Sequence, residues 1–206
     1  MTNHNPFIRD SNPLLIVLSG PSGAGKDAVL SHIKNSDYPF TCITTVTTRP
    51  KRINEKDDLD YHFVNQAEFQ SMVSHQQFLE HASVYGNWYG VPRKPVKAAL
   101  EQGQDVIIKV DIQGAATIRK IVPEAVLIFL TPPTTGELAS RLEQRRTESK
   151  NDLELRLKTT AQEMAELPRF DYLVFNHKDR IEQAVADIKA IVSAEKCRTK
   201  PRQVTI

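Results

Sequence analysis

A glycine-rich loop constrains the fold of this chain more than any other feature of its sequence. The loop consists of Gly20, Pro21, Ser22, Gly23, Ala24, Gly25 and Lys26. The wholly apolar run 14–18 before it predicts a buried strand, and the pattern from 27 to 34 after it predicts a helix. These residues match G-x-x-x-x-G-K-[ST] up to the lysine, in the strand and helix context that the motif requires. Backbone N–H groups, the helix N-terminus and Lys26 then all face an anion, so the loop predicts a nucleoside triphosphate site rather than an ordinary helix-capping turn.

The residue after the loop lysine departs from this pattern. Asp27 occupies the position at which Ser or Thr normally offers a hydroxyl to magnesium. A carboxylate oxygen is also a hard ligand that Mg²⁺ accepts. Asp27 is therefore the candidate metal ligand, with the ion otherwise held by the nucleotide phosphates and water.

Short apolar runs alternate with helical patterns along the rest of the chain. The further runs lie at 106–110, 125–130 and 172–175, and the helical patterns that follow them lie at 115–121, 135–145 and 181–192. This alternation predicts an α/β fold whose core is a parallel sheet flanked by helices. Between 41 and 92 the pattern changes to short strands around an amphipathic segment, 68–74, which predicts an inserted subdomain. The stretch 138–167 predicts two helices joined near 149–152, and 197–206 predicts a frayed tail.

Composition limits the class of partner. The 206 residues include 27 Lys and Arg against 25 Asp and Glu, which gives a formal net charge of +2. This excess is too small to predict binding along a nucleic-acid backbone or an anionic membrane, and no apolar stretch reaches the length of a bilayer span. Cys42 and Cys197 belong to no metal-ligand pattern. We expect no nucleic acid, no membrane and a reducing cytoplasm.

Further segments, taken together with the loop, resemble the guanylate kinase family, which phosphorylates GMP at the expense of ATP. The matching segments are 47–52 (TTRPKR), 60–64 (DYHFV), 78–82 (FLEHA), 86–90 (GNWYG) and 110–115 (VDIQGA), with continuations at 141–145 and 170–176. They occur in the family's order and spacing over most of the chain. The resemblance implies a P-loop kinase with ATP and Mg²⁺ as cofactors and GMP as acceptor, with dGMP a further acceptor to test.

The resemblance also implies three parts within a single domain. The parallel-sheet core takes 12–41, 94–133 and 158–197, and the GMP-binding insert takes 42–93. A helical lid takes 134–157, and a basic tail follows at 198–206.

The insert contains a set of donors for a phosphate. Arg49 and Arg52 can present two planar forks to the nearly dianionic phosphate of a nucleoside monophosphate, and Tyr61 and Tyr89 can add hydroxyl donors. The segment around the arginines, taken alone, also fits a solvated basic turn. The resemblance assigns these four residues to the GMP phosphate, with Thr45 beside them.

Glu80 is the candidate that recognises the base. It lies in an otherwise apolar segment, where an unpaired carboxylate is costly, although a lone Glu is also common on a surface strand. Guanine offers its N1–H and amino group side by side, and the family uses Glu here for that purpose. Asp111 joins the GMP site by the same resemblance. Val91 stands where the family has Ser or Thr near guanine O6, so one donor is lost.

Arginines crowd the predicted lid. Arg141 and Arg145 share one helix face, and a solvated face paired with glutamates is the ordinary interpretation. The resemblance instead places Arg141, Arg145 and Arg156 on ATP and the transferred phosphoryl, with Asn176 near adenine. The reaction then proceeds by charge neutralisation, without a covalent intermediate. The catalytic set is Lys26, Arg49, Arg145 and Arg156.

Two departures from the family pattern look linked. Position 27 has gained a carboxylate, and position 109, where relatives usually carry an acid, holds Lys109. We hypothesise that Asp27 either ligates Mg²⁺ or pairs with Lys109 and holds a metal-bound water, against the alternative of unlinked drift.

Two rival functions are weighed. Ribose bisphosphate phosphokinases of the same family share the Gly-Lys-Asp sequence at 25–27, but they have no use for Glu80 or the segment 47–52. Non-catalytic scaffold modules that bind phosphopeptides generally lack an intact phosphate loop. The guanylate kinase reaction is therefore the preferred interpretation.

Overall fold

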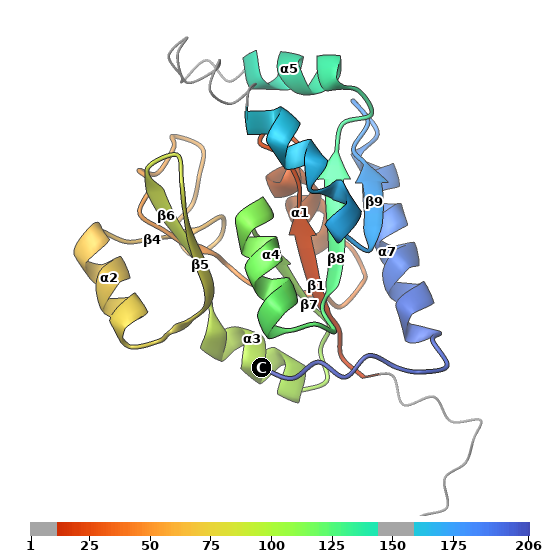
Figure 1. The fold of residues 1–206 in the computed structure, drawn as a ribbon, viewed down its shortest axis with the longest axis horizontal. Coiled ribbons are helices and arrows are strands. Elements are labelled where there is room, and N and C mark those ends of the chain that lie inside the picture. The colour runs from red at the N-terminus through yellow and green to blue at the C-terminus, as the bar shows by residue number, and fades with distance from the viewer. Residues whose placement is uncertain (1–11, 144–158) are drawn as a thin grey trace, which may run out of the picture.

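The computed structural model describes residues 12–143 and 159–206. A parallel sheet of five strands in the order β2-β7-β1-β8-β9 forms the core, which confirms the predicted α/β class (Figure 1). Its strands are β1 (Leu15–Ser19), β2 (Thr41–Cys42), β7 (Val106–Lys109), β8 (Val126–Thr131) and β9 (Tyr172–Phe175). The first strand is buried at every position because both faces of the sheet are covered.

Helices cover the two faces of this sheet. They are α1 (Lys26–Lys34), α3 (Arg93–Glu101), α4 (Ile112–Ile121), α5 (Thr135–Glu143), residues 159–165, the short η1 (Leu167–Arg169) and α7 (Ile181–Lys196). Alternate side chains of β1 point to opposite faces. Ile16 and Leu18 pack with α1 and α7, while Leu15 and Val17 pack with α3 and α4.

The predicted insert has a sheet of its own beside the core (Figure 1). Its four strands lie in the order β4 (His62–Phe63), β3 (Val46–Thr47), β6 (Asn87–Pro92) and β5 (Phe78–Val84). The helix α2 (Gln66–Ser74) packs on this sheet through buried Phe69, which stacks on Phe78. The insert therefore has a small apolar cluster separate from the two around the main sheet.

Element boundaries differ from the predicted ones where a cap decides them. Helix α4 begins at Ile112, before the predicted position 115, because the Asp111 side chain caps it and accepts a hydrogen bond from the Gly114 N–H at 2.8 Å. Helix α7 continues beyond position 192 to Lys196. The helix junction predicted near 149–152 and most of the predicted lid lie outside the described residues.

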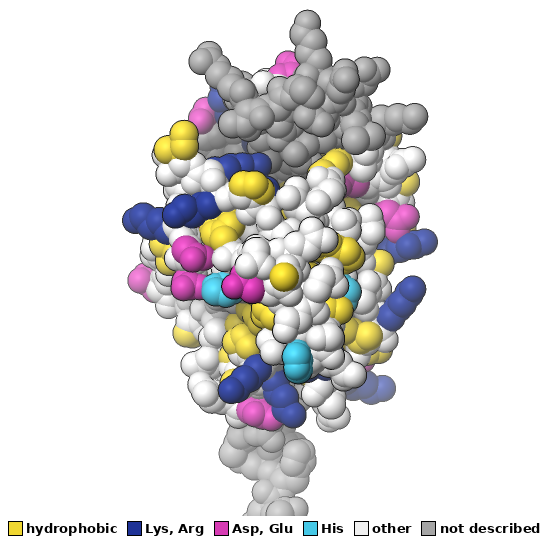
Figure 2. Space-filling view, turned by 90° about the vertical axis from the view of Figure 1, so that its left-hand side faces the viewer, with side chains coloured by type: hydrophobic (Ala, Val, Ile, Leu, Met, Phe, Trp, Pro, Cys, Tyr) yellow, Lys and Arg dark blue, Asp and Glu magenta, His cyan; other side chains and the backbone are white. Residues whose placement is uncertain are grey.

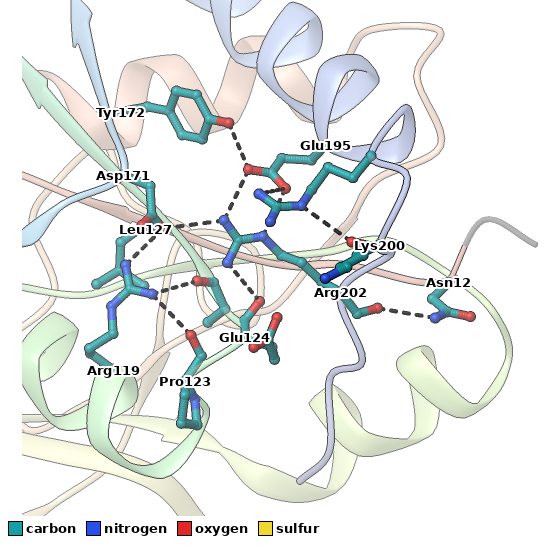
Figure 3. Close-up of polar contacts among 12 residues, drawn as sticks. Asn12, Arg119, Pro123, Glu124, Leu127, Asp171, Tyr172, Glu195, Lys200 and Arg202 are labelled. Carbon is teal, nitrogen blue, oxygen red and sulfur yellow. Dashed lines mark hydrogen bonds and ion pairs between the residues drawn. The ribbon is translucent and has the colours of Figure 1, made fainter.

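The prediction of a frayed tail at 197–206 is wrong. The segment runs from the end of α7 beneath the sheet toward α3 (Figure 1), and Val204 and Ile206 pack against the cluster between the sheet and α3. Arg202 donates from Nε and Nη2 to the carboxylate of Glu195 at 2.8 and 3.0 Å, as Figure 3 shows. The tail lacks an acid of its own, but its partner Glu195 lies on α7 and is only 3% exposed.

On the face that carries the insert, Figure 2 shows basic and acidic side chains of the described residues interspersed with one another. Within 12–143 and 159–206, no helix has both the length and the apolar character needed to span a membrane.

Candidate active site

A cavity of about 430 Å³ opens between the glycine-rich loop and the insert. Its wall brings together most of the predicted site residues from six separate segments. They are Gly20, Ser22, Gly23, Ala24, Gly25, Lys26, Asp27, Thr45, Arg49, Arg52, Tyr61, Glu80, Tyr89 and Asp111. Pro21, Val91, Arg141 and Asn176 are absent from that wall, while Arg145 and Arg156 lie outside the described residues.

The loop needs its glycines at two tight contacts. Gly20 has φ +142°, and a Cβ there would lie 2.0 Å from the carbonyl oxygen of Leu130. Gly25 has φ +89°, and its Cβ would lie 2.3 Å from the side-chain nitrogen of Asn176. Both conformations are disfavoured for any other residue, so the loop geometry accounts for the motif.

Lys26 lies folded back on the loop. Its Nζ donates to the carbonyl oxygens of Gly20 at 2.6 Å and Pro21 at 3.0 Å. Burial lowers the pKa of Lys26 to about 8, although nearby Glu163 acts in the opposite direction. Glu163 also accepts a hydrogen bond from the Ser22 N–H at 3.4 Å. Glu163 could not be singled out from the sequence, because it stands among many glutamates of a helical stretch.

Asn176 and Arg141 support the loop from outside the cavity. Asn176 donates from Nδ2 to the carbonyl oxygen of Ala24 at 2.8 Å. Arg141 donates to the backbone oxygen of Asn176 at 2.7 Å and to Glu137 at 2.5 Å. These contacts fix the loop between β1 and α1, and contact with ATP stays a prediction for both residues.

The two arginines of the insert, Arg49 and Arg52, both pair with the carboxylate of Glu55. Arg49 Nη2 lies 2.7 Å from Glu55 Oε1, and the backbone N–H of Arg52 donates to Glu55 Oε2 at 2.9 Å. The Arg49 guanidinium also lies 5.3 Å from the ring centre of Tyr61, within cation–π range. Burial tends to raise the pKa of Glu55, but its bonds from Arg49 and Arg52 lower it. Sequence reasoning missed Glu55, whose signal was an acid three residues after Arg52.

The predicted hydroxyl donors lie beside this arginine pair. The rings of Tyr61 and Tyr89 meet edge to face with 6.1 Å between their centres. The Tyr61 hydroxyl donates to Asp27 Oδ1 at 3.3 Å, so the insert contacts the start of α1. Thr45 donates its hydroxyl to the backbone oxygen of Lys109 at 3.3 Å, which ties it to the core sheet.

Glu80 lines the cavity and is 5% exposed. Burial, aided by the charge of Asp111, raises the pKa of Glu80 to about 8. Helix α4 approaches so closely that a Cβ on Gly114 would lie 2.7 Å from Glu80 Oε1. No hydrogen-bond donor among the described residues lowers the pKa of Glu80. The carboxylate is therefore suited to a ligand that brings N–H groups.

Val91 lies outside the wall of the cavity. It pairs with Glu80 across β5 and β6, but its side chain is 1% exposed and packs in the core cluster with Leu79 and Val96. Val91 therefore does not line the cavity, and its contact with a base stays a prediction.

Asp27 and Lys109 both line the cavity and form an ion pair, which confirms the hypothesised pairing. The metal-bound water of that hypothesis stays a prediction. Lys109 Nζ contacts Asp27 Oδ1 and lies 3.7 Å from the ring centre of Tyr61. Burial tends to lower the pKa of Lys109, but Asp27 and Tyr61 outweigh it and raise the pKa.

The donor set around the loop does not fit a magnesium ion bound by the protein. Asp27 Oδ1 already contacts the Lys109 ammonium and the Tyr61 hydroxyl. Asp111 Oδ1 caps α4. Phosphate-loop enzymes hold magnesium with a loop hydroxyl and an acid on a neighbouring strand, whereas this chain has Asp27 and Lys109.

The comparisons with known proteins agree with this geometry. The guanylate kinase family model matches residues 12–195. A guanylate kinase from Carboxydothermus hydrogenoformans is 41% identical over 187 residues, 91% of this chain and 91% of the relative. One from Nitrosomonas europaea is 42% identical over 185 residues, 90% of this chain and 91% of the relative. A guanylate kinase structure from Anaplasma phagocytophilum superposes with a TM-score of 0.73 at 33% identity, covering 92% of this chain and 89% of that one.

Proposed function

Because this chain belongs to the guanylate kinase family, which phosphorylates GMP to GDP with ATP, we propose that both substrates meet in the cavity between the glycine-rich loop and the insert. The observation that carries this placement is Glu80, a buried carboxylate that lines the cavity. Guanine presents its N1–H and amino group to one carboxylate, whereas adenine presents an acceptor at N1. A site built on buried hydrogen bonds rejects the wrong base strongly, since its polar groups are left unpaired.

The acceptor phosphate then lies at the arginine pair of the insert. Arg49 and Arg52 line the cavity and are held from behind by Glu55, with the hydroxyls of Tyr61 and Tyr89 beside them. This arrangement supports bidentate binding of a phosphate, which planar guanidinium groups favour. Asp111 and Thr45 complete the acceptor side, and dGMP is a second acceptor to test.

The donor phosphates lie on the loop from Gly20 to Lys26, at the start of α1. ATP is the phosphoryl donor of the family. Lys26 is expected to leave the loop carbonyls and neutralise the transferred phosphoryl, together with Arg49 and the lid residues Arg145 and Arg156. Mg²⁺ is proposed as the ion that arrives with ATP, held by the phosphates and water.

The proposed compartment is a reducing cytoplasm. Cys42 and Cys197 both carry thiols, and no disulfide joins them. Burial raises the pKa of the Cys42 thiol to about 11, so this thiol stays protonated and poorly reactive.

One assay tests the placement of the acceptor. ADP release is measured with GMP, dGMP, AMP, UMP and ribose 1,5-bisphosphate, for the wild-type chain and for Glu80→Gln. We expect turnover with GMP, and a loss of kcat/KM for GMP of about a hundredfold in Glu80→Gln, since the amide accepts only one of the two guanine N–H groups. Unchanged kcat/KM in that variant would remove Glu80 from the base site, and turnover of the sugar phosphate would favour the rival kinase.

A further inference from the structure

The ion pair between Asp27 and Lys109 connects three parts of the fold. Asp27 is in the first turn of α1, directly after the loop. Lys109 is the last residue of β7 and pairs in register with Leu18 of β1, just before the loop. Its backbone oxygen also accepts the Thr45 hydroxyl at 3.3 Å, and its ammonium lies over the Tyr61 ring. Loop, core strand and insert therefore converge on Lys109.

Lys109 is buried and yet faces the site. The residue is 9% exposed, and its side chain lines the same cavity as Lys26. An ammonium has three N–H bonds; that of Lys109 contacts Asp27 Oδ1 and lies over the face of the Tyr61 ring. A further N–H is suited to an oxygen of a bound ligand. A cation at this depth is tolerated because Asp27 pairs with it.

The position of this ammonium determines its chemistry. It lies between the donor side, marked by Asp27 at the loop, and the acceptor side, marked by Tyr61 in the insert. Both substrates bring phosphate oxygens to this region under the proposed function. Lysine binds phosphate as a compact point charge, and the contacts of this ammonium with Asp27 and the Tyr61 ring hold the charge in place.

We propose that Lys109 is a phosphate-binding residue of this kinase, positioned by Asp27, and that it supplies a fixed positive charge to the site. The inference rests on the proposed placement of the substrates. It predicts that the chain binds phosphate-bearing ligands in the absence of a divalent cation, because the ammonium remains in the site when the ion is removed.

Isothermal titration calorimetry in buffer with EDTA tests this inference without turnover. The ligands are ATP and GMP, which separate the two phosphate sources, and adenosine and guanosine, which lack phosphate. Lys109→Met is expected to weaken ATP or GMP binding about tenfold or more, in line with the loss of one charge-assisted hydrogen bond, and to leave both nucleosides unchanged. Lys97→Met is the matched control, since Lys97 is an exposed lysine of α3 whose contact to Glu101 is 3.9 Å.

Two double variants test the role of Lys109 independently of the single change. If the single variant fails to fold because Asp27 is left unpaired, the double change Asp27→Ser with Lys109→Met removes both charges and carries the same expectation. The reversed change, Asp27→Ser with Lys109→Asp, is expected to lose affinity for ATP in EDTA and to gain more from added Mg²⁺ than the wild type does.

The outcomes separate this inference from the proposed function. Wild-type affinity for both ATP and GMP in Lys109→Met, or an equal loss for the nucleosides, would overturn the phosphate-binding role. If Glu80→Gln leaves GMP use unchanged, the acceptor placement fails, and the ATP titrations still decide the role of Lys109.

Discussion

Glu80 is expected to make guanine binding depend on pH in the neutral range. Its carboxyl group has a pKa of about 8, because it is buried and faces the charge of Asp111. Only the carboxylate accepts both guanine N–H groups, since the protonated form turns one of its oxygens into a donor. The apparent affinity scales with the fraction of binding-competent protein. That fraction is about one half at pH 8 and about one hundredth at pH 6, so affinity should fall about fiftyfold between them.

Guanosine is the ligand for this experiment, because the phosphate of GMP titrates near pH 6 and would add its own dependence. Dissociation constants are measured by calorimetry from pH 6 to 8. The wild type should bind more tightly as pH rises, with a slope approaching tenfold per unit at the acidic end. Glu80→Gln, which cannot ionise, should bind weakly and with no slope.

A flat profile for the wild type would refute this reasoning. It would mean that Glu80 is already ionised before guanosine binds, or that its carboxylate does not receive the base. A slope of equal size in Glu80→Gln would assign the titration to another group, and Asp111→Asn would then be the next variant to titrate.

The remaining predictions concern the arginine pair and the tail. Arg49→Lys and Arg52→Lys should each raise KM for GMP about tenfold in steady-state assays, because lysine keeps the charge and loses the planar fork; full tolerance of both would place the phosphate elsewhere. Glu55→Gln should raise KM for GMP but not for ATP, since it loosens both arginines, whereas a lowered KM would mean that Glu55 competes with the phosphate. Arg202→Met should reduce the free energy of unfolding by about 2 kcal/mol and lower Tm by about 4–8 °C. This loss is smaller than is usual for a broken buried ion pair, because Tyr172 still donates a hydrogen bond to Glu195. An unchanged Tm would contradict the role of the Arg202–Glu195 pair.

The core of the fold was predictable because its strands are continuous apolar runs. Ile16, Leu15 and their neighbours are buried on both faces, which produces a signal that no surface strand has. The loop was predictable because Gly20 and Gly25 adopt positive φ values at close contacts, which only glycine tolerates. Positions decided by capping, such as the start of α4 at Asp111, were missed by a few residues.

The site was predictable where local chemistry was anomalous. Glu80 stood out because a carboxylate among apolar residues needs a partner. Val91 was assigned by resemblance alone, and its burial in the core cluster depends on tertiary packing that the local sequence does not encode. Contacts between distant segments, such as Arg202 with Glu195, depend on tertiary packing that the pattern of one segment does not encode.

The separate apolar cluster of the insert has an optical consequence. Trp88 is the only tryptophan in the sequence, and it packs at the edge of that cluster beside Phe69. Its backbone is hydrogen-bonded to Thr47 and Thr48, which lead directly into Arg49. Emission from this single indole reports the surroundings of the insert without an attached dye. If GMP binds at Arg49 as proposed, its entry can be followed through this intrinsic fluorophore in a stopped-flow instrument.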